Sequence, residues 1–524
     1  MITTPLLRLA LRRAPLLILA SAVLAGCSSP LRSSPTSGAV SAGGGGSSGT
    51  DAVGSGGSGG DGIFPDDPSQ PPCTPTLTVK AGGPALLVND PAVLAHFPME
   101  RVLKQLLDRS GPSELTPLTV LQRLFDAENT GEGGVFSDVT HCDTFDNAAF
   151  KNAPADGCPR AEGALAASAG LLTPGDSDFF APVALVNRFD LTPQNLQSCG
   201  EYRIVYAKWS GRSDPGNRVF VIFEGSLPNP LAGNINGCRP VAAHWASLEK
   251  MSSAAEIAAA LEAFYFDGLP GIAPIVDPGS FGALSQDDDP YGASHGQLRV
   301  SQRMQEPWEM REYHFLSPLL GKVSGPPRFE PVTVKNNPLG SLFGATGPGQ
   351  PELFQSVFVD QVVQDLAAPK LTGIRMAIPN VFNTGESALE SAAAPDYLAS
   401  LGEGGASFTT MIDQRLATID VVKSCDPQDP LDAKAIVARA TTQTCAGCHA
   451  PRAFLGEERK IGCGLVWPDS LNGAHIDEKG ALSPALTDVF LPRRASVLGT
   501  YLQACDLPQI MANLQPVPAS GIPD

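Results

Sequence analysis

Glu201-Tyr202-Arg203-Ile204-Val205-Tyr206-Ala207 is the stretch that decides the fold, together with Val219-Phe220-Val221-Ile222-Phe223-Glu224 a few residues later. The first stretch alternates and is rich in β-branched and aromatic residues, which favour strands. The second is a run of the kind found in buried strands. Gly211 and Asp214-Pro215-Gly216 lie between the two and supply turn residues. The pair therefore predicts a β-hairpin.

Weaker patterns surround this hairpin, and together they predict an α+β main body. Thr116 and Pro117 are suited to begin a helix, and Ser253 with Glu256 forms a capping-box pattern before another. The predicted helices are 102–107, 118–125 and 254–264, and the further predicted strands are 76–80, the segment leading in from Ala181, 299–302 and 311–315.

Length and composition bound the organisation of the chain. Its 524 residues exceed what one hydrophobic core supports and predict two or three domains. The formal charge of −18 argues against nucleic acid as a partner, because phosphate binding needs clustered Lys and Arg. We predict a targeting segment at 1–27, a flexible Gly/Ser linker at 28–72, the α+β body at 73–423, and a small, mostly α-helical domain at 424–524.

The first 27 residues have the layout of an export signal. Three arginines precede a short apolar run that is too short to span a bilayer comfortably. The run ends in Leu24-Ala25-Gly26-Cys27, which resembles the lipobox of bacterial lipoproteins. That resemblance implies acylation of Cys27 and a membrane tether through several acyl chains. Ser28 after the cysteine favours the outer membrane, at its periplasmic face or the cell surface, over retention at the inner membrane.

Cys445-Ala446-Gly447-Cys448-His449 is the most specific motif in the chain. C-x-x-C-H is the attachment signature of c-type haem. Two thiols add to the vinyl groups on one edge of the porphyrin, and the histidine is then held beneath the ring as an axial ligand. Ala446 and Gly447 allow the turn to lie tightly against the macrocycle.

Three other interpretations of the motif compete with haem. A thioredoxin-like pair normally opens the helix that stabilises its first thiolate, whereas this motif follows a predicted helix that Asp429 and Pro430 begin. A zinc site would need further ligands at matching spacing, and the chain has no second C-x-x-C. A structural disulfide across two intervening residues would be strained. Haem is therefore favoured.

The order helix, C-x-x-C-H, loop and second helix (493–504) resembles the small monohaem cytochromes c over about the last 100 residues. The resemblance implies that Cys445 and Cys448 are thioether anchors and that His449 is the proximal iron ligand. The family usually supplies a methionine before the terminal helix, and this segment has none. His475 is the favoured sixth ligand, Met511 is an alternative, and a site without a sixth protein ligand remains open.

The other cysteines and one polar cluster leave alternatives open. Eight cysteines remain after Cys27 and the motif, which in an oxidising compartment suggests up to four disulfides. Sequence neighbours would pair Cys142 with Cys158 and Cys199 with Cys238.

The run 187–190, with Glu201 and Arg203, is either a buried Arg–carboxylate network or a ligand site.

These patterns predict an exported, lipid-anchored protein that transfers single electrons through one covalent haem c. The redox partner proteins are not identified by the sequence. One alternative is a haem-dependent oxidoreductase with its substrate site in the main body. The other is a non-catalytic surface lipoprotein whose C-x-x-C is a disulfide. An electron carrier is favoured over an enzyme.

Overall fold

A computed structural model describes residues 78–144, 158–282, 296–320, 324–391, 393–503 and 507–515. All of them belong to one compact unit, Ser69–Asp524. The predicted signal segment, Cys27 and the predicted linker lie outside the described residues. The prediction of an export signal and a lipid anchor is therefore not tested by the structure.

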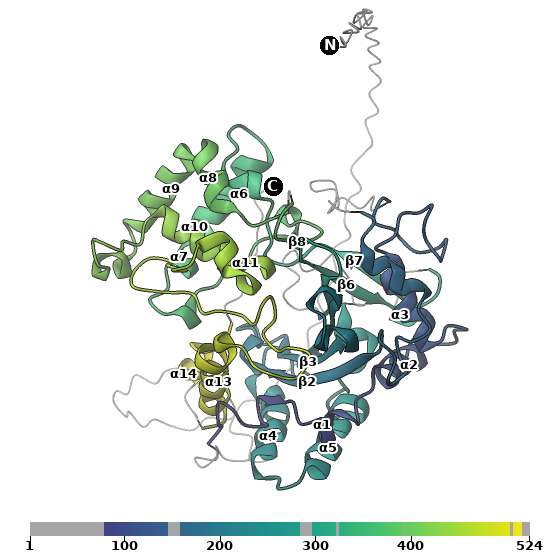
Figure 1. The fold of residues 1–524 in the computed structure, drawn as a ribbon. Coiled ribbons are helices and arrows are strands. Elements are labelled where there is room, and N and C mark those ends of the chain that lie inside the picture. The colour runs from purple at the N-terminus through teal and green to yellow at the C-terminus, as the bar shows by residue number, and fades with distance from the viewer. Residues whose placement is uncertain are drawn as a thin grey trace, which may run out of the picture. The chain divides into compact units, whose positions relative to one another are not determined.

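An antiparallel sheet of eight strands forms the centre of this unit and confirms the α+β class (Figure 1). Seven strands follow one another in chain order across the sheet, and the eighth pairs with β6. The strands are β1 (Leu87–Val88), β2 (Phe180–Arg188), β3 (Ser198–Lys208), β4 (Arg218–Pro228), β5 (Gln297–Arg303), β6 (Glu309–Leu316), β7 (Arg328–Val332) and β8 (Ser387–Ala388).

The predicted hairpin is present as β3 and β4, with Arg203 opposite Glu224. Strands alternate their side chains between the two faces, and here both faces are covered. Tyr202 and Tyr206 point into the main core, where the Tyr206 hydroxyl donates to the Phe97 carbonyl at 2.9 Å. Glu201 and Arg203 point to the opposite face. The prediction of a strand at 76–80 is wrong for its described part, since residues 78–80 are irregular.

Helices cover the tyrosine face of the sheet. Thr116 caps its helix by accepting from the Thr119 amide, and Ser253 and Glu256 form the predicted capping box. Figure 1 shows α1, α4 and α5 together against the β2 and β3 end of the sheet. The helices are α1 (Pro91–Leu94), α2 (Met99–Asp108), α3 (Pro117–Asp126), α4 (Arg239–Ser247) and α5 (Ala254–Glu262).

A second hydrophobic core is built mainly from helices after β7. Its members come from both sides of the predicted boundary between residues 423 and 424, because Phe358, Tyr397 and Phe408 pack in the same cluster as Ile436 and Val437. The helices are α6 (Gln350–Val357), α7 (Val363–Leu366), α8 (Tyr397–Gly404), α9 (Ala406–Leu416) and α10 (Ala433–Thr442).

The last part of the chain crosses from the second core back to the first. The prediction that Asp429 begins the helix before the motif is wrong: Asp432 accepts from the Ala435 amide, and α10 starts at Ala433. The Asp429 carbonyl instead accepts from the Cys463 amide. The remaining helices are α11 (Cys445–His449), α12 (Pro451–Leu455), α13 (Leu491–Gln503) and α14 (Leu507–Met511).

Three disulfides lie within the described residues. Two are the sequence-neighbour pairs, Cys142–Cys158 and Cys199–Cys238. The third, Cys425–Cys463, ties the segment before α10 to the loop after α12. Cys73 and Cys505 fall outside the described residues, so a fourth pair is not tested.

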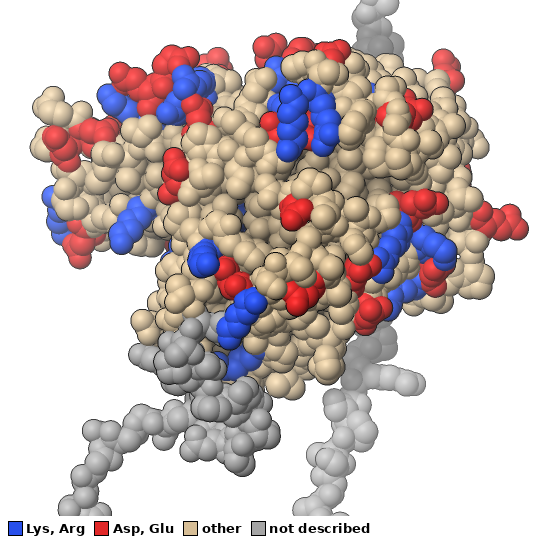
Figure 2. Space-filling model, turned by 60° about the horizontal axis from the view of Figure 1, so that its bottom comes forward, with Lys and Arg blue, Asp and Glu red and all other residues tan. Residues whose placement is uncertain are grey.

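One face of the molecule mixes both signs of charge (Figure 2). Figure 2 shows Lys and Arg side chains interspersed with Asp and Glu over the face it presents. None of the helices in the described ranges combines the length and the apolar character that crossing a bilayer requires.

Candidate cofactor site

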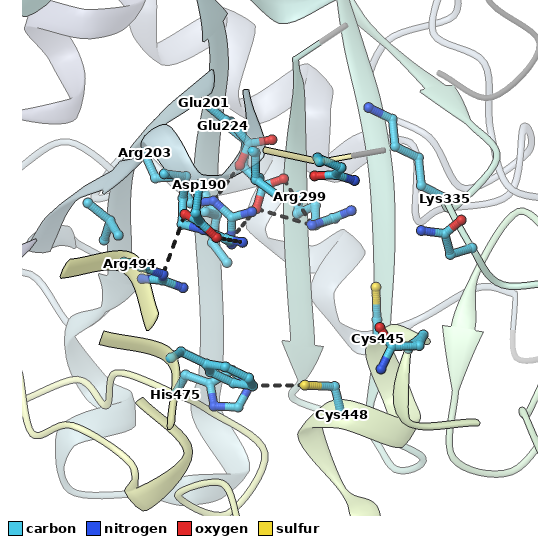
Figure 3. Close-up of a pocket in the computed structure, with 18 of the residues that line it drawn as sticks. Asp190, Glu201, Arg203, Glu224, Arg299, Lys335, Cys445, Cys448, His475 and Arg494 are labelled. Atoms are coloured by element: carbon cyan, nitrogen blue, oxygen red, sulfur yellow. Dashed lines mark hydrogen bonds and ion pairs between the residues drawn. The ribbon is translucent and has the colours of Figure 1, made fainter. Parts of the chain in front are cut away.

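A cavity of about 750 Å³ lies between the sheet and the later segments of the chain. This volume falls in the upper part of the range typical of small-molecule and cofactor pockets, about 300–1,000 Å³. One wall is the face of β2 to β6 that carries Glu201 and Arg203. The others are formed by residues 371–377, 442–449, 473–476 and 486–497. Figure 3 shows charged side chains on the sheet wall, and Cys445, Cys448 and His475 across the cavity from them.

The C-x-x-C-H motif forms the short helix α11 on the rim of this cavity. Thr444 caps it by accepting from the Gly447 amide at 2.9 Å. The Ala446 amide donates to the Ser387 hydroxyl of β8 at 3.0 Å. A Cβ on Gly447 would lie 1.9 Å from the Thr441 carbonyl oxygen, so only glycine fits there. The small side chains of the motif thus allow its backbone to pack closely against the neighbouring backbone.

His449 is held by two neighbours. Its Nδ1 lies 2.9 Å from the Gly473 carbonyl oxygen, which can only accept, so Nδ1 carries the proton. Nε2 is then the unprotonated nitrogen, the form in which histidine binds metals. The ring also stacks on Trp308, with centroids 5.4 Å apart. Burial lowers the pKa of His449 to about 4, which keeps the imidazole neutral near pH 7.

Cys445 and Cys448 are free thiols that both line the cavity. Burial raises the pKa of each to about 12. In reactive dithiol pairs, a helix N-terminus or a cation lowers the pKa of one thiol. Cys445 begins the short helix α11 and lies near Arg299, whose charge lowers its pKa, but burial outweighs that charge. The surroundings of this pair therefore favour protonated thiols, which is not the state of a thioredoxin-like centre.

His475, the favoured sixth ligand, also lines the cavity, next to the motif. Its Nε2 lies 3.4 Å from Cys448 Sγ, and its Nδ1 lies 3.1 Å from the Ser483 hydroxyl. The rings of His475 and His449 are in contact, with centroids 4.7 Å apart. Metal–imidazole bonds of about 2 Å on each side of an iron would hold them farther apart. Coordination of one iron by both would thus require His475 to move away from His449.

Met511, the alternative ligand, is not among the residues that line the cavity and packs partly buried against the main core. Two other methionines do line it, Met310 on β6 and Met376. Sequence reasoning missed both because it searched for a methionine only after the motif. Their approach to the motif depends on the fold, and no local pattern signals it.

Charged side chains form a ladder across the sheet wall. Arg203 pairs with Glu201 at 2.6 Å and with Glu224 at 2.9 Å. Arg299 pairs with Glu224 at 3.0 Å and with Glu312 on the next strand, β6, at 2.6 Å. The strand register explains the ladder, because Arg203 faces Glu224 and Arg299 faces Glu312 directly. Sequence reasoning named Glu201 and Arg203; Glu224 on β4 and Arg299 on β5 join them only through the strand register, which no local pattern signals.

Asp190 continues this ladder beyond β2. It makes a two-point ion pair with Arg188, at 2.9 and 3.0 Å. Burial raises the pKa of Asp190, but the charges of Arg188 and then Arg494 outweigh burial and bring it to about 2. The carboxylate is therefore ionised at neutral and mildly acidic pH.

The residues present suit a covalently attached haem. The cavity brings two thiols and a neutral imidazole together, and cationic side chains line the sheet wall across from them (Figure 3). Vinyl groups and propionates occupy opposite edges of the porphyrin, so this polarity matches the cofactor. No cluster of three or more His, Cys, Asp and Glu able to hold a metal ion is found in the described part of the chain. Haem iron takes most of its ligands from the porphyrin and needs no such cluster.

Comparisons with protein-family models, with curated proteins and with solved structures found no match to this chain.

Proposed function

We propose that this protein is a c-type cytochrome-like electron carrier with one haem bound covalently through Cys445 and Cys448. The observation that carries the proposal is the position of the motif: its two thiols and His449 open into a cavity of about 750 Å³. In this proposal, residues 424–524 supply the cytochrome-c-like part, and the sheet completes the pocket.

Haem, when bound, supplies the one-electron redox step. The chain's own residues bind and orient it. The free thiols of Cys445 and Cys448 are the attachment groups, and Gly473 holds the His449 ring through Nδ1 so that Nε2 is the donor to iron. Met310 and the neighbouring apolar residues of the wall exclude water, which together with axial ligation sets the redox potential.

His475 is proposed as the sixth ligand, with Met511 the less favoured candidate. A pair of imidazoles gives a lower potential than a histidine–methionine pair. The expected state is therefore six-coordinate, low-spin and of low potential, reached when His475 separates from His449 and Cys448. A high-spin spectrum of the purified protein would contradict His475 as a ligand.

The direct test is expression of the full chain together with haem-attachment machinery. We expect haem-linked peroxidase staining on a denaturing gel and a mass increase of one haem. The double substitution Cys445→Ala/Cys448→Ala should abolish both signals. The matched control, Cys142→Ala/Cys158→Ala, removes a disulfide whose cysteines do not line the cavity and should retain haem. Unmodified wild-type protein would overturn the proposal and leave a motif that forms a disulfide or serves another purpose.

A haem-dependent oxidoreductase is the second candidate, and the ionic wall of the same cavity favours it. Charged side chains of the sheet share one pocket with the motif, so a polar substrate could bind next to the cofactor. Carbon monoxide separates the two candidates, because a closed six-coordinate site resists it. Rapid binding to the reduced protein would favour the enzyme.

We also propose that Cys27 is acylated and that the protein is exported and anchored to a membrane, the outer membrane being favoured. The sequence Leu24-Ala25-Gly26-Cys27 supports this. A linker of 45 residues would give the folded unit a reach of roughly 35–40 Å from the lipid surface. Cys27→Ala should release the protein from sedimented membranes and remove incorporation of labelled palmitate. Unchanged sedimentation and labelling would contradict the anchor.

A further inference from the structure

Positive charge is in excess around the cavity, although the chain as a whole is strongly acidic. The formal charge of the chain is −18. Seven cationic side chains line the cavity, against three carboxylates. The cationic residues are Arg188, Arg203, Arg299, Lys335, Arg375, Arg493 and Arg494, and the acidic ones are Asp190, Glu201 and Glu224. Such local charge is costly to bury unless an anion compensates it.

The pairing pattern shows which cations lack a carboxylate. Arg188, Arg203 and Arg299 each hold one of the three acids within 3.0 Å. Arg375 and Arg493 donate to backbone or amide oxygens and form no ion pair with any described residue. Glu312 gives Arg299 a second carboxylate at 2.6 Å, so among the described residues Arg375 and Arg493 are the lining arginines without an ion pair.

Arg494, in the first turn of α13, is a buried cation of this cavity without a close carboxylate. Its side chain is only 9% accessible, and its nearest carboxylate oxygen, on Asp190, is 3.8 Å away. Its Nε is buried without a hydrogen-bond partner among the described residues. Burial lowers the pKa of Arg494 well below its ordinary value, and the charge of Arg188 lowers it further. Figure 3 shows Arg494 between Asp190 and the ring of His475.

We propose that Arg494, with Arg188 and Arg203 beside it, forms a carboxylate-binding subsite in this cavity. A carboxylate offers several acceptor positions to guanidinium groups and supplies the missing negative charge. Two sources provide this chemistry. One is the propionate edge of the haem, a source that rests on the proposed function. The other is a free carboxylic acid, which does not depend on haem.

The test compares full-length wild type with Arg494→Gln and Arg494→Lys, each prepared with and without attached haem. Arg452→Gln is the matched control, because Arg452 is an exposed arginine outside the cavity lining. Succinate is the probe, measured by calorimetry, and the midpoint potential is measured on the haem-loaded forms. Circular dichroism checks that each variant is folded, and Arg494→Lys retains the charge if Arg494→Gln does not fold.

We expect the haem-free chain to bind succinate, Arg494→Gln to weaken binding at least about tenfold, and Arg452→Gln to leave it unchanged. If propionates occupy the subsite, attached haem abolishes succinate binding, and Arg494→Gln lowers the midpoint potential, because loss of a nearby cation favours oxidised iron. Succinate binding that persists with haem attached identifies a free acid as the ligand.

The proposal is overturned if succinate binds wild type and Arg494→Gln equally. It is also overturned if succinate does not bind and the potential of the variant equals that of wild type. Failure of the proposed function gives a different result, since no preparation would then carry haem. The succinate titration of that same chain still decides whether the subsite exists.

Discussion

The two walls of the cavity differ in how the chain builds them. The thiols and His449 come from one local stretch, whose turn is fixed by Thr444 and Gly447, and the Gly473 carbonyl holds the His449 ring. The ionic wall draws one or two residues from each of several strands that are distant in sequence. A motif reveals the first wall, whereas only strand register reveals the second. The comparison suggests that local changes should affect cofactor attachment, and changes in the sheet should affect the charge balance.

Two disulfides of nearly equal span provide the sharpest comparison. Cys425–Cys463 closes a loop of 38 residues that contains the motif, and Cys199–Cys238 closes a loop of 39 residues that begins in β3. Chain entropy predicts that replacing either pair by alanine costs about 4 kcal/mol of unfolding free energy. Denaturant titration should therefore give similar losses, while haem content should fall only for Cys425→Ala/Cys463→Ala. Equal haem loss in both would remove the distinction between the walls.

The next largest effect is expected at Glu224, which is fully buried between Arg203 and Arg299. Glu224→Gln leaves two arginines undercompensated, and breaking a buried pair of this kind costs about 3 kcal/mol. Glu330→Gln is the control, because Glu330 pairs with Arg328 at a partly exposed site and should cost under about 1 kcal/mol. Chemical denaturation of both variants compares their losses of unfolding free energy. Similar losses would show that the ladder is not a connected network.

Gly447→Ala should disturb the local wall at about 1–3 kcal/mol, because the new methyl group would meet the Thr441 carbonyl. The amount of attached haem should fall in the same variant. Gly499→Ala on α13 is the control: nothing lies within 4 Å of the added Cβ, and alanine favours a helix over glycine by about 1 kcal/mol. Opposite shifts in melting temperature are expected, and shifts of the same sign would contradict the packing argument.

The smallest expected effect is a pH dependence from Asp190. Its pKa in the folded protein, about 2, is below the ordinary value of 3.8. The ion pair therefore stabilises the fold fully above pH 4, and this contribution is lost as pH falls through 2. It amounts to about 2 kcal/mol at most. The unfolding free energy of Asp190→Asn should fall less steeply between pH 4 and pH 2 than that of wild type. An equal slope in both proteins would show that another group causes the pH dependence.

The sequence predicted the parts of the molecule that local chemistry determines. The hairpin at β3 and β4, the helix that Thr116 caps and the capping box at Ser253 were all found, because turn and cap residues act within a few positions. Asp429 failed as a cap because Asp432, with equal chemistry, lies closer to the first apolar turn. The strand at 76–80 was predicted from a weak alternation that the fold does not use.

The assembly of the site could be predicted only in part. Cys445, Cys448, His449 and His475 were named from the chain, and all four line the cavity. Trp308, which stacks on His449, was not associated with the site, because it is far from the motif in sequence and approaches it only through the fold. The ionic wall was named only in part: the run 187–190, Glu201 and Arg203 were singled out, whereas Glu224 and Arg299 join them only when the register is known.

The stacking of Trp308 on His449 gives the protein a built-in optical reporter. Trp467 lines the cavity itself, so two of the four tryptophans lie beside the site. A haem placed there absorbs where indole emits and would quench their fluorescence. The other two are Trp245, stacked on Tyr202 in the main core, and the exposed Trp209. The filling of the pocket can therefore be followed by emission in real time, without a label.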